Sequence, residues 1–259
     1  MLSKAQRGEF DQSGYLRVRG AFDPEAARRM VAAVWDQLAA EARLRPDDPQ
    51  TWLEGPVAGI AELKRTAQFA AIGTGQAPAV LDDLLGAGGW RVPSNWGQLL
   101  VTFPTRDRQW HFKPLWHTDY AYDTPPGRLV GVQVFSILSD LKPGGGGTLI
   151  LQHSHQLLQA FVQVAPREAL RKMKSARRAL FDRYPWLVEI SKPQSLTDPS
   201  GWIRDQRATL EGVSVQMREI IGAAGDMIFC HPWLLHSPAP NHLDRPRMMC
   251  TQRIHATKI

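Results

Sequence analysis

Trp116-His117-Thr118-Asp119 is the stretch from which the organisation of this chain can be worked out. His117 and Asp119 are two positions apart, so their side chains point the same way if the segment is extended. A third residue, His236, lies far downstream at the end of an apolar run. Two imidazoles and one carboxylate form the ligand set that holds non-haem Fe(II) and leaves other coordination positions open. The sequence therefore predicts a metal site built from His117, Asp119 and His236.

Arg247 follows His236 by eleven positions and lies in the next apolar run. A guanidinium can bind a carboxylate through two parallel hydrogen bonds. 2-Oxoglutarate that chelates the metal through its keto-acid end needs such a partner for its far carboxylate. We therefore predict that Arg247 fixes 2-oxoglutarate beside the metal. Considered alone, Arg247 would be interpreted as a surface arginine next to Arg245, and its spacing from His236 decides against that interpretation.

Composition places the chain among globular proteins, with 259 residues of which 43% are hydrophobic. No run reaches the roughly 18 apolar residues of a membrane span, and the first residues lack the apolar segment of a signal peptide. We therefore expect a cytoplasmic protein with no membrane partner. Cys230 and Cys250 both lie in apolar, strand-like runs. Buried free thiols, which suit a reducing compartment, are expected rather than a disulfide.

The net charge of +6 raises the question of a nucleic-acid partner. No nucleic-acid motif is present and most basic residues are dispersed, so none is expected. One dense basic patch occupies residues 167–178, where basic side chains recur at helical spacing: Arg167, Arg171, Lys174 and Arg178. Contact with an anionic substrate is one interpretation of this patch. The preferred one is the solvated outer face of an amphipathic helix.

The pattern of predicted elements changes near residue 90. Before it, Asp23-Pro24-Glu25 has the cap, proline and acid of a helix start, and helical spacing recurs near 58–72 and 76–86. After it, short apolar runs separated by Gly/Pro turns predict strands at 97–103, 129–138, 148–151, 223–230 and 247–254. Such strands favour a sandwich or barrel. Helical spacing returns at 156–182, followed by a less regular stretch to about 210.

Several motifs together resemble the phytanoyl-CoA dioxygenase family of Fe(II)/2-oxoglutarate oxygenases. Residues 10–25 resemble the family's N-terminal strand and helix, and residues 116–119 its W-H-x-D motif. Residues 147–155 are similar to its G-x-L…G-S-H segment, with Gln152-His153 in place of the usual Pro-Gly. Residues 225–247 resemble its last signature, including the eleven-residue offset between histidine and arginine. The resemblance covers most of the chain and is weakest in 40–90 and 156–215.

The resemblance implies a mainly β fold with helical decoration, a double-stranded β-helix of jelly-roll or cupin-like type. The whole chain, 1–259, is then expected to form a single dioxygenase domain. Residues 1–90 would give mostly helical support, residues 91–155 and 211–259 the barrel strands, and residues 156–210 a helical insert that could act as a lid. Iron would be held by His117, Asp119 and His236, and 2-oxoglutarate by Arg247, with O2 as the oxidant.

The family also suggests further residues near the co-substrate. Gln98 falls where some members use a glutamine, and it shares a strand face with Thr102; a solvent-facing side chain is an equal alternative. Phe135 falls where members place an aromatic ring against the co-substrate, with core packing as the alternative. Halogenating relatives replace the carboxylate of the metal motif, so Asp119 favours hydroxylation or desaturation of a small-molecule substrate.

Candidate substrate contacts come from the aromatic segment around the motif and from two histidines: Trp116, Tyr120, Tyr122, His111 and His155. Packing in the core is the alternative for most of the aromatic residues. Three other functions stay open. They are a cupin-like metal enzyme without 2-oxoglutarate, which would not need Arg247, a non-catalytic binding protein on the same barrel, and a basic nucleic-acid-binding module. The sequence does not indicate an oligomeric state or the identity of the substrate.

Overall fold

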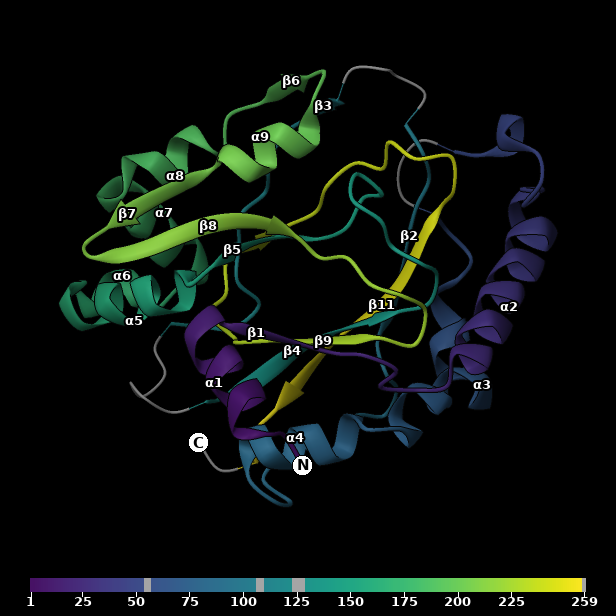
Figure 1. Ribbon diagram of the computed structural model, residues 1–259, viewed down its shortest axis with the longest axis horizontal. Coiled ribbons are helices and arrows are strands. Elements are labelled where there is room, and N and C mark those ends of the chain that lie inside the picture. Colours follow the sequence, from purple (N-terminus) through teal and green to yellow (C-terminus); the bar gives the residue numbers. More distant parts are fainter. Residues whose placement is uncertain (54–56, 106–109, 123–128, 258–259) are drawn as a thin grey trace.

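The computed structural model describes residues 1–53, 57–105, 110–122 and 129–257 (Figure 1). Two antiparallel sheets form its centre. The larger has the strand order β1 (Tyr15–Val18), β9 (Met227–Cys230), β4 (Gly131–Ile137), β11 (Arg247–His255) and β2 (Gln98–Thr102). The smaller has the order β10 (His236–Ser237), β5 (Leu149–Gln152), β8 (Val213–Glu219) and β7 (Arg207–Leu210). Two outer strands, β3 (Trp110–Phe112) and β6 (Gln194–Leu196), pair separately.

Helices form two groups, one before the strands and one between β5 and β8. The first group contains α1 (Lys4–Ser13), α2 (Pro24–Ala42), η1 (Pro49–Thr51), η2 (Ala61–Arg65), α3 (Ala67–Ala70), η3 (Ala71–Thr74) and α4 (Ala77–Leu85). The second contains α5 (Ser154–Val164), α6 (Arg167–Leu170), α7 (Met173–Arg183), α8 (Pro185–Glu189) and α9 (Pro199–Asp205). None of the helices in the described ranges has the length and apolar character needed to span a membrane.

The alternation of side chains along each strand separates three hydrophobic clusters. Val132 and Val134 of β4 point to one side, where they pack with residues of α2 and α4. Phe135 and Ile137 point to the other side and pack with Ile150 of the smaller sheet. The two sheets therefore face each other across a shared interior. A third cluster joins the outer face of the smaller sheet to α5, α7 and α8, so helices cover the outer faces of both sheets.

Local sequence signals explain where the N-terminal helices begin and end. The Ser3 hydroxyl accepts from the Gln6 amide while the Gln6 side chain accepts from the Ser3 amide, which forms a capping box for α1. Gly14 ends this helix at φ +81°. Asp23 caps α2 by accepting from the amides of the second and third residues after it. These two helices flank β1 and hold it at the edge of the larger sheet.

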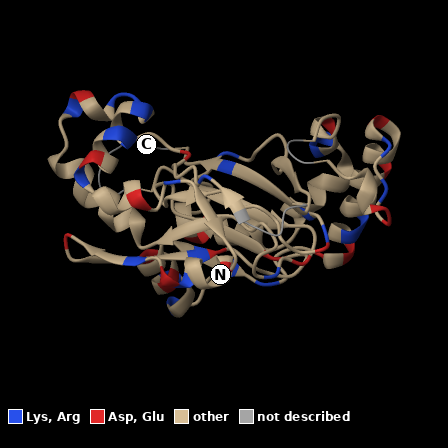
Figure 2. Ribbon diagram, turned by 90° about the horizontal axis from the view of Figure 1, so that it is seen from above, with Lys and Arg blue, Asp and Glu red and all other residues tan. Residues whose placement is uncertain are grey.

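The structure corrects several expectations for the helices and the insert. The described residues contain more helix than strand, so the expected mainly β composition is wrong; α1 was not predicted at all. Residues 156–210 are not purely helical, because β6 and β7 lie within them and β7 pairs with β8. The basic patch 167–178 is not one helix, since Lys172 is extended (φ −123°, ψ 127°) and separates α6 from α7. Charged residues lie mainly on the outer helices and loops (Figure 2).

Candidate metal centre

A pair of backbone hydrogen bonds brings the two predicted histidine ligands together. The His117 amide donates to the His236 carbonyl and the His236 amide donates to the His117 carbonyl, both at 3.0 Å. Directly opposed residues of an antiparallel pair carry their side chains on the same face. The two imidazole rings accordingly lie 4.3 Å apart between centroids. The main chain itself therefore sets the distance between residues that are 119 positions apart in sequence.

The same local hydrogen bond orients both rings. His117 Nδ1 lies 2.7 Å from the Leu115 carbonyl, and His236 Nδ1 lies 3.1 Å from the Leu234 carbonyl. A carbonyl oxygen can only accept, so each Nδ1 carries the proton and donates. In each neutral imidazole the lone pair then belongs to Nε2. This arrangement fixes the tautomer that a metal requires before any metal is bound.

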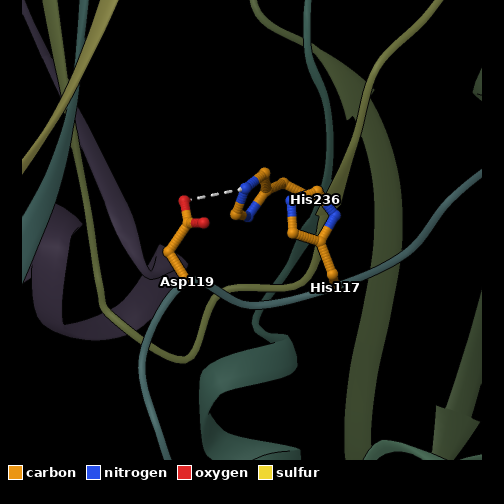
Figure 3. Close-up of side chains that lie close together, drawn as sticks. All are labelled: His117, Asp119 and His236. Atoms are coloured by element: carbon orange, nitrogen blue, oxygen red, sulfur yellow. Dashed lines mark ion pairs between the residues drawn. The ribbon is translucent and has the colours of Figure 1, made fainter. Parts of the chain in front are cut away.

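Asp119 completes the triad (Figure 3). Its Oδ2 lies 3.3 Å from His236 Nε2, and one ligand atom from each of the three residues lies within 4.8 Å of the others. Among the described residues, this is the group of histidine, cysteine and acidic side chains arranged to hold a metal ion. The structure therefore brings together all three residues that the sequence predicted as ligands.

The protonation states of the triad suit metal binding. Burial is the largest cause that lowers the pKa of His117; the neighbouring His236 and Arg177 act in the same direction, while the Leu115 carbonyl and Asp119 oppose them. Burial would raise the pKa of Asp119, but the contact with His236 Nε2 and the nearby His117 and Arg253 outweigh it and lower that pKa. A neutral imidazole and an ionised carboxylate are the forms that coordinate a cation.

Arg247 is buried at 7% exposure and has unused hydrogen-bond capacity. Its Nη2 donates to Thr102 Oγ1, a contact set by the pairing of Arg247 with Thr102 across β11 and β2. Its Nε and Nη1 are buried and have no partner among the described residues. Burial lowers the pKa of Arg247 to about 10, and the charge of Glu219 opposes this shift. A buried guanidinium with two free donors fits a carboxylate ligand.

The two other residues predicted near the co-substrate lie on inward faces. Phe135 is buried and its ring stands edge-on to His236, 5.9 Å away between centroids. Phe135 also packs in the hydrophobic cluster between the sheets. Core packing and a position near the co-substrate, the two interpretations of this residue, are therefore compatible. Gln98 shares the face of Thr102 but is exposed and lies opposite Thr251, at the far end of β2 from Arg247. Its role at the co-substrate stays a prediction.

The aromatic candidates for substrate contact are buried. Trp116 donates from Nε1 to the Ile190 carbonyl (3.2 Å), and the Tyr120 hydroxyl lies 3.1 and 2.9 Å from the Val132 and Ile254 carbonyls. Both residues are therefore core residues with satisfied polar atoms, as the alternative interpretation held. Tyr122 is also buried and accepts from the Thr118 hydroxyl at 2.9 Å. It nevertheless borders a surface hollow beside His117.

The two histidine candidates lie elsewhere in the fold. His111 is exposed on β3, which pairs with β6. His155 is buried at the start of α5, where Nε2 lies 3.0 Å from the Asp11 carbonyl of α1 and its ring packs 4.8 Å from His231. These contacts join α5 to the N-terminal helix. They give His155 a structural part in the fold that its sequence context did not indicate.

Sequence reasoning missed two polar residues of the sheets, the partly buried Glu219 and the buried Gln133. Glu219 accepts from the Gly144 amide (2.7 Å) and the Gly147 amide (2.9 Å), and burial raises its pKa. It thereby fixes the glycine-rich turn and places a carboxylate near Arg247. Gln133 lies two residues before Phe135 on the inward face of β4, and its buried Oε1 has no partner in the part of the chain that the structure describes. A single glutamine between valines was the only sequence signal for it.

The facing antiparallel sheets and the His-Asp-His triad define a cupin-like metal-binding protein. A family model described as phytanoyl-CoA dioxygenase (PhyH) matches residues 10–249, and the chain belongs to this family. No match was found among curated proteins.

Solved structures with similar folds include the non-heme alpha ketoglutarate dependent carbocyclase SnoK from nogalamycin biosynthesis. It has 18% identity and a TM-score of 0.61 over 98% of this chain and 84% of that chain. AviO1 from Streptomyces viridochromogenes Tue57 has 15% identity and a TM-score of 0.58, with coverage of 100% and 96%. Iron-bound HygX from Streptomyces hygroscopicus has 17% identity and a TM-score of 0.53, with coverage of 100% and 89%. At these identities the likeness shows the fold.

Proposed function

We propose that this chain is an Fe(II)- and 2-oxoglutarate-dependent dioxygenase that hydroxylates, or otherwise oxidises, an unactivated C–H bond of a small-molecule substrate. The observation that carries the proposal is that the chain has both the His-Asp-His triad and the buried guanidinium of Arg247. That residue shares a face of β11 with Met249, which packs between the sheets, and it has two buried donors without partners. Membership of the phytanoyl-CoA dioxygenase family supports the same conclusion.

The triad residues would hold the iron, the histidines through Nε2 and Asp119 through a carboxylate oxygen. Three protein ligands leave coordination positions open, as a catalytic site needs. Iron and 2-oxoglutarate, when bound, supply the oxidising power for the C–H bond, with O2 consumed and succinate and CO2 released. The carboxylate of Asp119 would take a coordination position that halogenating relatives leave open for chloride, which favours hydroxylation or desaturation.

The chain's own contribution is binding, orientation and the exclusion of water. Arg247 would bind the far carboxylate of 2-oxoglutarate through Nε and Nη1, while Thr102 keeps the third nitrogen of the guanidinium in place. Phe135 places an apolar ring edge-on beside His236. A dry pocket strengthens the charge interaction of Arg247 with its ligand.

The fold assignment belongs to the same proposal. We assign the two facing sheets to a double-stranded β-helix of jelly-roll type and residues 1–259 to one dioxygenase domain. The pairing of β1, near the start of the chain, with β9 supports one domain, because elements from both ends build the larger sheet. The insert between β5 and β8 would then cover the substrate side of the metal centre.

The test is an anaerobic titration of metal-free protein with Fe(II) and then 2-oxoglutarate, recorded as a visible difference spectrum. We expect a weak charge-transfer band in the wild type, no band in His236→Ala and a weakened band in Arg247→Ala. Iron binding without the band would instead favour a cupin-like metal enzyme that does not use 2-oxoglutarate. Absence of iron binding in a folded wild-type protein would disprove the assignment of the triad.

A further inference from the structure

A hollow of about 330 Å³ opens directly beside the metal centre. One wall comes from the segment that carries the metal motif and the other from the first turns of α7. Its lining residues are His117, Thr118, Tyr122, Met173, Lys174 and Arg177. A candidate metal ligand, two cations and the exposed thioether of Met173 therefore share one surface depression. The helical insert thus contributes its own side chains to the surroundings of the metal.

The basic residues of this part of the insert fall into two groups. Arg171 pairs with Glu168 at 3.1 Å, and Arg178 pairs with Asp182 at 3.9 Å. Lys174 and Arg177 form no ion pair with any carboxylate in the described part of the chain. They are three positions apart on α7 and therefore lie on one face of the helix. Four basic residues of 167–178 have no ion pair in the described part of the chain, and two of these four line the hollow, Lys174 and Arg177; the other two are Arg167 and Lys172.

Arg177 did not belong to the helical stripe expected from the sequence. That stripe assumed one continuous helix over 167–178, and the break at Lys172 shifts the phase of α7 relative to α6. A second hollow of about 320 Å³ on α7 also includes Lys174 and Arg177, together with the Arg178–Asp182 pair. The two cations therefore stand between the outer surface and His117, where a molecule approaching the metal would meet them.

We propose that the substrate of this enzyme carries an anionic group, a carboxylate or a phosphate, that Arg177 and Lys174 bind. An apolar part of the substrate next to this group would rest against Met173, and the carbon to be oxidised would lie on the His117 side. Arginine suits such oxygens because its fork donates two parallel hydrogen bonds, and lysine adds a mobile point charge. The assignment of this ligand as the substrate rests on the proposed function; the anion site itself does not.

The experiment measures binding of three small probes to the full chain by calorimetry at low ionic strength. Phenyl phosphate and benzoate present the two kinds of anion on one ring, and benzyl alcohol is the neutral probe. Each titration is made with and without Fe(II) and 2-oxoglutarate under nitrogen. The variants are Arg177→Gln, Lys174→Gln and the double variant. Arg171→Gln is the matched control, because it removes the same charge from the same insert away from the hollow.

We expect the wild type and Arg171→Gln to bind phenyl phosphate, benzoate or both. The anion that binds more tightly indicates whether the substrate carries a phosphate or a carboxylate. Arg177→Gln and Lys174→Gln should each weaken binding about tenfold, as loss of one charge-assisted hydrogen bond implies. All substituted positions are exposed, and glutamine is a good helix former, so the variants should fold.

Three results would overturn the proposal. They are absence of binding of both anions to the wild type, equal weakening in Arg171→Gln, and binding of benzyl alcohol as tight as that of the anions. The difference spectrum with Fe(II) and 2-oxoglutarate, recorded for the wild type and each variant, tests the dioxygenase function separately from the anion site. If the wild type lacks that band but the probes follow the expected pattern, the dioxygenase proposal fails and the anion site stands. If the band is present and the pattern is absent, only the anion site fails.

Discussion

Replacing Arg247 should change co-substrate affinity and protein stability in opposite directions. The guanidinium is buried, one nitrogen donates to Thr102, and two nitrogens have no partner. Glu219 compensates the charge only in part, since the pKa of Arg247 still falls to about 10. The ligand-free protein therefore carries the desolvation cost of an incompletely paired cation.

Arg247→Met removes the charge and keeps an unbranched apolar side chain. Loss of one partner of a buried, hydrogen-bonded charge pair costs about 2–5 kcal/mol of binding. The Kd for 2-oxoglutarate should therefore rise from roughly 30-fold to several thousandfold. The free energy of unfolding without ligand should stay level or rise, because an apolar group replaces a buried charge.

Two measurements test both halves of this prediction. Anaerobic calorimetry gives the Kd for 2-oxoglutarate in the iron-loaded protein, and thermal unfolding with and without 2-oxoglutarate gives the ligand-dependent shift in Tm. That shift should disappear in Arg247→Met, because a ligand stabilises only a state that binds it. Arg245→Met is the control, since Arg245 is exposed two residues earlier and both measurements should be unchanged.

Either of two results would refute the reasoning. Wild-type affinity of Arg247→Met for 2-oxoglutarate would show that its free nitrogens do not bind the co-substrate. A fall in the free energy of unfolding by more than about 2 kcal/mol would show that the folded protein fully compensates the guanidinium, as it does for a well-paired buried ion.

Other predictions concern the metal, pH and two glycines. EDTA should lower the Tm of iron-loaded wild type but leave that of His117→Ala unchanged, as scanning calorimetry would show. Burial lowers the pKa of His231 to about 3, so the unfolded chain binds a proton that the folded chain does not. The free energy of unfolding should fall as pH decreases from about 6.5, and this residue should contribute up to about 1.4 kcal/mol per pH unit. Urea titrations of the metal-free proteins should show a flatter pH profile for His231→Asn than for the wild type. Equal slopes of the two pH profiles would contradict the assignment. Gly14→Ala should destabilise by about 2–4 kcal/mol, because Gly14 has φ +81° and a Cβ would lie 2.4 Å from His155 Nδ1. Gly8→Ala, inside α1 with open space around it, should stabilise by up to about 1 kcal/mol in the same denaturation assay.

The candidate metal ligands could be predicted from sequence because their chemistry and spacing are local. The spacing of two indicates His117 and Asp119, and the position at the end of an apolar run indicates His236. The orientation of the rings could not be predicted. It depends on two backbone carbonyls and on a pair of main-chain hydrogen bonds between distant segments. Residue types alone carry no information about such contacts.

Other features were missed because their signals are weak or depend on tertiary contacts. Of the residues of α1, only Phe10 and Ser13 are buried, so there is little hydrophobic period to detect; the capping pair Ser3 and Gln6 was the usable signal. The β7–β8 hairpin turns at Glu211 and Gly212, both at positive φ, and Glu-Gly is a weaker turn signal than Asn-Gly. In the sequence, Glu219 has the pattern of a solvated strand residue. Its role depends on the glycine-rich turn, whose Gly144 and Gly147 amides donate to it.

The strand order has a consequence for how the chain folds during synthesis. β11 is the last strand, yet it lies between β4 and β2 and carries Arg247. Until β11 leaves the ribosome, β4 and β2 each expose an unpaired edge. In the same way β1 stays unpaired until β9, some two hundred residues later, has been synthesised. Folding must then close contacts of very long sequence separation, which is slow. Nascent chains stalled before residue 247 should therefore need a chaperone to stay free of aggregation.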